Sequence, residues 1–227
     1  MAKGFSDAKG KHDSGAKVAS YEWGRNGLHK MRLFGGIVPR YLYWVKNSEG
    51  KSLPFECLAF DRESERFTNV ERDVVQEHFP KDKCSWGYAM LGLDLNDGEP
   101  KVRAIHLKKK LYEQIRSLAD DLGDPTDPED GWDIIFERVS TGSHAFNVEY
   151  ILKAIKCQNA KRELTAEERE AIDKAPSVDE AFPRETVEQQ EQRLQKFLRG
   201  KDKEEDEVPD DVASELDEDG ESISDLD

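Results

Sequence analysis

The sequence lacks the features that place a protein in a membrane or outside the cell. It contains only 3 Cys in 227 residues, and an odd number at wide spacing argues against a disulfide framework. No apolar run approaches the length that spans a bilayer. Residues 1–5 lack the apolar core of a secretory signal. These absences predict a soluble protein of a reducing cytoplasm.

Catalytic signatures are missing too. Residues 50–52, Gly-Lys-Ser, lack the upstream glycine and the following helix of a phosphate-binding loop. None of the 5 His is spaced with Ser or Cys as a nucleophile pair would be. The acidic residues within 124–130 could serve a metal-dependent nuclease, which stays a weaker alternative. Their Asp-Pro and Asp-Gly steps favour a loop instead. The sequence therefore predicts a protein that is not an enzyme and uses no metal or cofactor.

Charge is distributed very unevenly along the chain. Residues 1–162 carry 26 Lys and Arg against 25 Asp and Glu, whereas residues 163–227 carry 8 against 24. The last segment, 201–227, has 14 acidic residues and 2 Lys. Such a block cannot bury apolar surface, so it is predicted to be a disordered interaction tail, with a purely solubilising tail as the alternative. The residues expected to dock into a basic, partly apolar groove of a partner are Asp217, Glu218, Asp219, Ile223, Asp225, Leu226 and Asp227.

Composition divides the chain into four parts. The N-terminal part is rich in Gly, Lys, Ser and Ala, and apolar residues are concentrated after it. Thr165, Ser177 and Thr186 each precede a Glu or Gln by three residues, which is the capping-box signature of a helix start. The predicted parts are a flexible basic arm at 1–32, a binding core at 33–157, a helical linker at 158–200 and the acidic tail at 201–227.

The core has the pattern of a mainly β fold. Turn signals separate three predicted hairpins, formed by residues 40–46 with 54–60, 86–93 with 101–107, and 132–139 with 145–152. Between the second and third hairpins, Leu107, Leu111, Ile115 and Leu118 recur at helical spacing and predict a helix over 107–122. Six short strands with one inserted helix fit a small five- to six-stranded β-barrel.

Basic side chains alternate with aromatic rings on these strands. Cations can follow phosphates while flat rings stack on unpaired bases, so the pattern predicts a surface for single-stranded nucleic acid. Strand alternation places Tyr41 and Tyr43 on one face and Trp44 on the other, so about half of the rings are expected in the core. Stacking does not distinguish the sugar, which leaves RNA as an alternative to DNA. The candidate binding residues are Arg40, Tyr41, Tyr43, Trp44, Lys46, Lys51, Trp86, Tyr88, Lys101, Arg103, Lys108, Lys109, Lys110, Tyr112 and Arg116.

Three stretches of this core occur in an order typical of one family. Residues 49–52, Glu-Gly-Lys-Ser, form a turn after the first strand, and Trp86 begins a hydrophobic strand that ends near Asp94. Lys101-Val102 then leads without a gap to Lys109-Lys110 and a helix that contains Tyr112. With the acidic C-terminus, these stretches resemble the helix-destabilising single-stranded-DNA-binding proteins of large tailed bacteriophages, over about residues 33–152 and the tail.

The resemblance implies an OB-fold core, a basic arm used for self-association along the strand, and a tail that contacts replication and recombination proteins. It also implies a protein that coats and protects single-stranded DNA in phage replication, repair and recombination, in the host cytoplasm. Two features differ from the family. Arg103 and Ile105 stand where the family has stacking aromatics, and His78 and Cys84 are not followed by the family's Cys-x-x-Cys, so no zinc is expected. The alternative function is an acidic-tailed protein-interaction adaptor without nucleic-acid binding.

Overall fold

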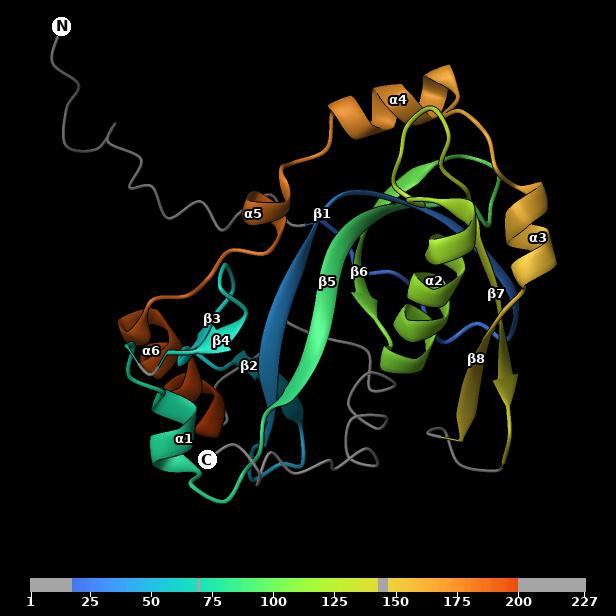
Figure 1. Ribbon diagram of the computed structural model, residues 1–227. Helices are drawn as coiled ribbons and strands as arrows, with labels where there is room; N and C mark the ends of the chain where they lie inside the picture. The colour runs from blue at the N-terminus through green and yellow to red at the C-terminus, as the bar shows by residue number, and fades with distance from the viewer. Residues whose placement is uncertain (1–17, 69, 143–146, 200–227) are drawn as a thin grey trace, which may run out of the picture.

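An antiparallel sheet of six strands dominates the computed structural model, which describes residues 18–68, 70–142 and 147–199 (Figure 1). Its strand order is β6-β5-β1-β7-β8, and β2 also pairs with β1. The predicted mainly β class is confirmed. The six strands are β1 (Gly27–Lys46), β2 (Ser52–Glu56), β5 (Ser85–Asp94), β6 (Lys101–Leu107), β7 (Ile134–Ser140) and β8 (Val148–Leu152).

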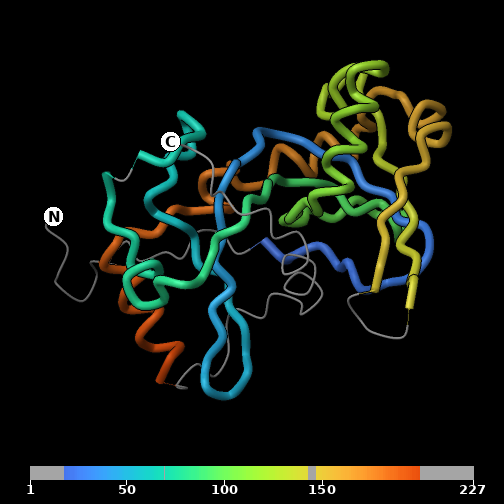
Figure 2. Tube along the Cα trace, turned by 60° about the horizontal axis from the view of Figure 1, so that its bottom comes forward, coloured from blue at the N-terminus to red at the C-terminus, as the bar shows by residue number. Residues whose placement is uncertain are grey.

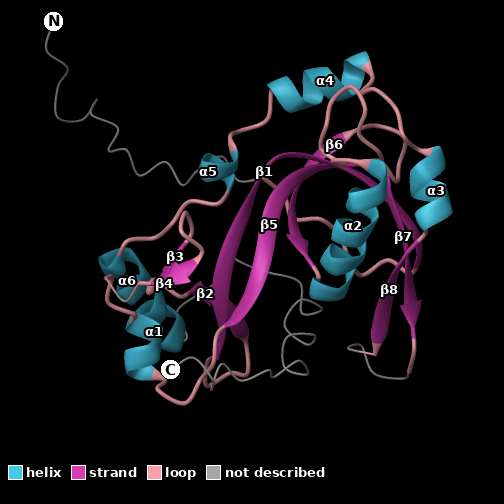
Figure 3. Cartoon of the chain, in the orientation of Figure 1, coloured by secondary structure: helices cyan, strands magenta, loops and turns pink. Residues whose placement is uncertain are grey.

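The remaining elements are short or helical (Figure 3). Strands β3 (Phe60–Asp61) and β4 (Arg66–Phe67) form a separate small hairpin. No helix among the described residues is long and apolar enough to cross a membrane. The helices are α1 (Val74–His78), α2 (Lys109–Leu122), α3 (Ala154–Asn159), α4 (Ala166–Asp173), α5 (Val178–Ala181) and α6 (Val187–Leu198).

The long strand β1 organises the sheet because it pairs with three partners in succession. Its first residues, up to Met31, pair with β7, the middle pairs with β5, and the end from Leu42 onward pairs with β2. The register with β5 shifts between Phe34 and Val38, next to Gly35, which has a φ of 74°. A glycine adopts this backbone without strain, and such a bulge bends the strand. One strand can therefore serve both halves of the molecule.

The sheet is not closed into a barrel by backbone pairing. In the part of the chain that the structure describes, β6 and β8 lie at its two ends and share no ladder. Residues preceding β1 cover the β6 edge, because Tyr21 N donates to Ala104 O at 3.0 Å. The Gln114 side chain of α2 covers the β8 edge: its Nε2 lies 3.0 Å from Tyr150 O and its Oε1 lies 2.8 Å from Leu152 N. Side chains and α2 therefore occupy the opening.

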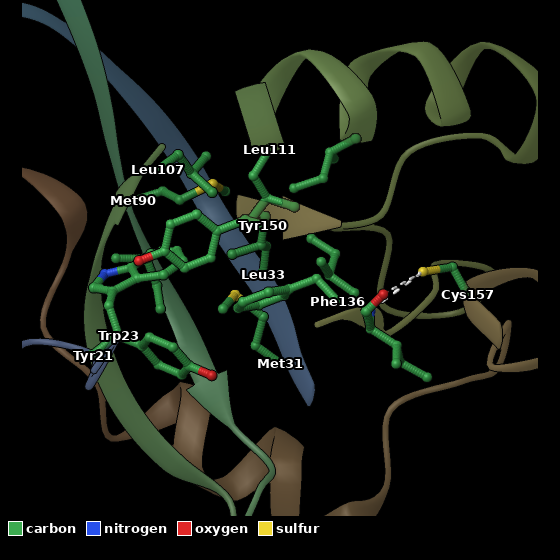
Figure 4. Packing of buried hydrophobic residues seen from close by; sticks show 14 of the residues in the cluster. Tyr21, Trp23, Met31, Leu33, Met90, Leu107, Leu111, Phe136, Tyr150 and Cys157 are labelled. Carbon is green, nitrogen blue, oxygen red and sulfur yellow. Dashed lines mark hydrogen bonds between the residues drawn. The ribbon is translucent and has the colours of Figure 1, made fainter. Parts of the chain in front are cut away.

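The first core cluster lies beneath α2 and fills this opening (Figure 4). Leu111 and Ile115 of α2 meet Met31, Leu33 and other buried apolar side chains of the sheet. The predicted helix is confirmed, but it begins at Lys109, and Leu107 is still part of β6.

The prediction of a flexible arm over residues 1–32 is wrong for residues 18–32, which pack on the sheet. Tyr21 and Trp23 are each only 1% exposed, and the Trp23 ring packs edge-on to Tyr150 at 5.3 Å. Arg32 is fully buried and forms an ion pair with Asp133. Two large aromatic rings bury enough apolar area to hold this segment on the sheet. Residues 1–17 lie outside the described part of the chain.

A second cluster lies at the other end of the same sheet face. Tyr43 and Val45 of β1 pack there with Phe55 of β2 and with buried valines of α1. Leu194 and Phe197 of α6 complete the cluster and are 0% and 2% exposed. The helix α6 is therefore part of the folded body.

The opposite face of the sheet carries a third cluster. Val38, Ala89 and Leu91 belong to it, and Phe182, which follows α5, packs onto them. The C-terminal segment runs from α3 past α4 and α5 to α6, so it passes along the sheet (Figure 2).

The capping boxes predicted at Thr165, Ser177 and Thr186 are all present and start α4, α5 and α6. The segment predicted as a helical linker is helical, but it is packed rather than extended, because its apolar residues complete the second and third clusters. Residues 200–227 lie outside the described part.

Candidate nucleic-acid interface

A shallow depression lies on the sheet between the two clusters that share one face. Tyr41 of β1 stands directly opposite Trp86 of β5, and Pro39 stands opposite Tyr88. Paired residues of an antiparallel ladder point to the same face. The depression is lined by Pro39, Arg40, Tyr41, Phe60, Glu65, Trp86, Gly87 and Tyr88.

Six rings follow one another in and beside this depression: Tyr41, Phe60, Phe67, Trp86, Tyr88 and Tyr112. We call the surface that they form the aromatic cleft. On the α2 side, Trp86 packs on Tyr88 at 4.9 Å, and Tyr88 on Tyr112 at 4.2 Å. On the side of the β3–β4 hairpin, Tyr41 lies 4.8 Å from both Phe60 and Phe67. The pairing of Tyr41 with Trp86 joins the two groups, so the cleft runs across the sheet from the hairpin to the helix.

Neighbouring rings hold these side chains in place, yet most of them remain partly exposed. Phe67 is 40% exposed, while Tyr41, Trp86, Tyr88 and Tyr112 are half-buried. Burial, followed by the hydrogen bond with Tyr112, raises the pKa of Tyr88 to about 12, so its hydroxyl stays neutral at physiological pH. Neutral, partly exposed rings held by their neighbours can stack on flat ligands with little loss of side-chain entropy.

Positive charge borders the cleft on the helix side. The Lys109 Nζ lies 5.9 Å from the centre of the Trp86 ring, and Tyr112 and Arg116 follow at helical spacing on the same side of α2. Lys110 lies in the first turn of α2. Arg66 precedes Phe67 in β4, on the hairpin side, and strand alternation turns it to the other face of the hairpin. Among the described residues none of these four cations pairs with a carboxylate. Their charge is available to an anionic ligand.

Two arginines connect the β3–β4 hairpin to parts of the chain that are distant in the sequence. Arg184, which lies between α5 and α6, donates to Phe60 O at 2.9 Å and to Leu58 O at 2.7 Å. Arg62 forms an ion pair with Glu56 and donates to Phe182 O at 2.9 Å. The hairpin wall of the cleft is therefore fastened to the C-terminal segment.

Several of the residues predicted from the sequence do not reach the cleft. Tyr43 is 2% exposed, and its hydroxyl oxygen lies 2.8 Å from Gln76 Oε1 and 3.0 Å from Asp73 Oδ2. Lys108 is 7% exposed, and its Nζ lies 5.6 Å from the Trp23 ring. Both side chains belong to the packed body, so these two predicted contacts are corrected.

Arg40 and Trp44 point to the opposite sheet face from Tyr41. The Arg40 guanidinium lies 5.4 Å from the Phe182 ring and hydrogen-bonds His106 Nδ1. Burial lowers the pKa of Arg40 to about 10 and that of His106 to about 3, so the histidine is neutral. Arg40 lines the depression only at its margin and holds the C-terminal segment.

The remaining predicted cations lie at the two ends of the sheet. Lys46 and Lys51 flank the β1–β2 turn. Lys101 pairs with Asp94 in the β5–β6 ladder and forms an ion pair with Asp97 at 3.0 Å. Asp94 lies eight positions beyond Trp86 along β5, which is about 27 Å at about 3.4 Å per residue. Arg103 lies two residues closer and is half-buried.

Sequence reasoning missed Phe60, Glu65, Arg66 and Phe67. Their strands are only two residues long, so they have no alternation to detect. The signal in the sequence was a polar five-residue stretch, 61–65, that begins with Asp. In the structure, the Asp61 carboxylate accepts a hydrogen bond from the backbone N–H of Glu63. That side-chain contact is typical of a tight turn.

The alternative sites weighed from the sequence have structural explanations. The Asp127 carboxylate accepts from the backbone N–H groups of Glu129 and Asp130, and Asp124 accepts from Thr126, as in a turn. These contacts support the loop interpretation over a nuclease site. Among the described residues, no three or more His, Cys, Asp or Glu side chains are placed to hold a metal ion.

No protein-family model matches the chain. A curated protein, the "Probable ssDNA-binding protein" of Escherichia phage T5, is 27% identical to it over 266 aligned positions, which cover the whole of both chains. This match includes the N-terminal and C-terminal parts as well as the sheet. The resemblance to phage single-stranded-DNA-binding proteins, inferred from the sequence, is confirmed by this match.

Proposed function

We propose that this chain is a non-enzymatic single-stranded-DNA-binding protein. The observation that carries the proposal is the aromatic cleft, whose partly exposed rings lie beside cations without carboxylate partners. Unpaired bases stack on such rings at about 1–3 kcal/mol each, and neighbouring cations neutralise the phosphates. Duplex DNA stacks its bases internally, so it cannot use the rings. The full-length similarity to the T5 protein supports the same conclusion.

The proposed mechanism is binding of the unpaired state. A protein that binds only single strands shifts the melting equilibrium of a duplex by mass action. In phage replication, repair and recombination this would extend the template and protect it from nucleases. The site of action would be the host cytoplasm. A distorted OB fold, open between β6 and β8, would provide the scaffold.

Two further parts of the proposal concern segments outside the described residues. The basic residues within 1–17 would promote self-association along the strand. The acidic tail, including Ile223 and Leu226, would recruit replication and recombination proteins and would compete with DNA for the cleft cations. An acidic chain tethered to the body acts at high effective concentration, which makes such competition effective.

The direct test is fluorescence anisotropy with a labelled oligonucleotide, presented as a single strand, as the matched duplex and as RNA of the same sequence. We expect tighter binding of the DNA single strand than of the duplex. Equal binding of the RNA would extend the proposal to both nucleic acids. Failure to bind any of them would contradict the function and leave the protein-interaction adaptor as the better account.

A further inference from the structure

Of the residues that line the depression, Glu65 is the one that carries a carboxylate. It lines the depression together with Tyr41, Trp86 and Tyr88. Glu65 also contributes to the raised pKa of Tyr88, after burial and Tyr112, which is consistent with a negative charge facing the tyrosine hydroxyl. A carboxylate opposes phosphate binding, so its presence in a DNA cleft needs another explanation.

The hairpin turn fixes the position of Glu65. Its φ of 51° makes it the one non-glycine residue with a left-handed backbone among those described. The Asp61 carboxylate holds the turn by accepting from the N–H groups of Glu63 and Ser64, each at 2.8 Å. Within the described residues, no hydrogen bond or ion pair engages the Glu65 side chain. Its acceptor oxygens are therefore free for a ligand.

The charges of the two cleft walls differ. The helix wall carries Lys109 and Arg116, whereas the tip of the hairpin carries Glu63 and Glu65. The neighbouring Arg66 lies on the hairpin face away from Phe67 and the cleft. Phosphates are drawn to the helix wall and repelled from the tip. A strand bound along α2 therefore turns its bases toward the rings and toward Glu65.

We propose that Glu65 selects bases that carry an exocyclic amino group, and cytosine over thymine in particular. This inference rests on the proposed single-stranded-DNA binding. A carboxylate accepts a hydrogen bond from cytosine N4, whereas thymine presents the O4 acceptor at the same place and is repelled. Glu65 is then a specificity-determining residue in a cleft that otherwise stacks any base.

The test compares full-length parent protein with Glu65→Gln and Glu63→Gln on short oligo(dC) and oligo(dT). Both substitutions remove one negative charge from the same hairpin, but only residue 65 lines the depression. The parent should prefer oligo(dC) by a factor on the order of fivefold, the size of one ordinary net hydrogen bond at a site that water still reaches. Glu65→Gln should abolish that preference, because an amide donates to thymine O4 as well. Glu63→Gln should keep it.

A modified oligonucleotide provides a second arm. Replacing cytosines by N4,N4-dimethylcytosine removes the amino donors but leaves a flat base. It should therefore weaken binding to the parent more than binding to Glu65→Gln, whose neutral amide oxygen is a weaker acceptor than the carboxylate. An unchanged dC-to-dT ratio in Glu65→Gln, or a parent that does not discriminate, would overturn base selection while leaving DNA binding intact. Loss of binding to every oligonucleotide in the parent would overturn both proposals.

Discussion

The salt dependence of DNA binding tests where the strand lies. Each phosphate neutralised on a single strand contributes about −0.7 to the slope of log affinity against log salt. Three cations without carboxylate partners lie on α2 beside the cleft, namely Lys109, Lys110 and Arg116. If these three contact phosphates, the slope is about −2.1. The nine cations predicted from the sequence would together give about −6.

Single substitutions on the full-length chain separate these two predictions. Lys109→Ala and Arg116→Ala should each reduce the steepness of the slope by about 0.7, because each removes one counterion-releasing contact. Lys101→Ala is the matched control, since its ammonium is paired with Asp97 and lies at the far end of β5. The acidic tail is present in every variant, so its contribution cancels in the differences.

The measurement is fluorescence anisotropy of one labelled single strand across a series of salt concentrations. A slope near −6 that becomes shallower in Lys101→Ala would place the strand along the whole sheet and refute the confined cleft. A slope that none of these substitutions changes would remove the cations from the interface.

Three further predictions can be tested separately. Trp86→Ala should weaken single-strand binding by about 1–3 kcal/mol and reduce the quenching of tryptophan fluorescence by DNA. Trp44 lies on the other sheet face, so Trp44→Ala should bind as the parent does. Parent-like binding by both variants would contradict stacking on Trp86. Burial lowers the pKa of His106 in the folded protein from its ordinary 6.5 to about 3. Between these two pH values the unfolded chain binds more protons than the folded one, so the free energy of unfolding decreases as the pH falls. Urea unfolding should show about 2 kcal/mol of this loss between pH 7 and pH 5, and His106→Asn should lack it; an equal loss in the variant would assign it to other groups. Truncation after Gly200 should raise the affinity for single-stranded DNA, most at low salt, and abolish the capture of replication and recombination proteins. Unchanged DNA affinity would rule out competition by the tail, and retained capture of these proteins would rule out recruitment by it.

Local signals predicted the elements better than their arrangement. The three hairpins and the three capping boxes are encoded within short stretches, and the structure contains all of them. The pairing of β1 with β5 and β7 joins residues far apart in the sequence, and no turn specifies it. The open sheet follows from that pairing. Local signals do not reveal it, so the sequence led to the expectation of a closed barrel.

The candidate site shows the same limit at the level of single residues. Lys108, Lys109 and Lys110 look alike in sequence, yet the first is buried over Trp23 and the second lies over Trp86. Only the start of α2 at Lys109 separates them, and helix ends are read from sequence with an error of a few residues. Burial of individual cations depends on neighbours that are distant along the chain.

The order in which the chain is made has a consequence for the hairpin wall. Phe60 and Leu58 depend on Arg184, whose separation from Phe60 is 124 residues. During synthesis from the N-terminus, the strands of the cleft emerge long before the arginine that fastens the hairpin. The acidic segment 201–227 leaves the ribosome only shortly after Arg184. A nascent chain thus acquires its fastened cleft and its negative tail almost together, which limits the time in which an unfinished protein could coat cellular single strands.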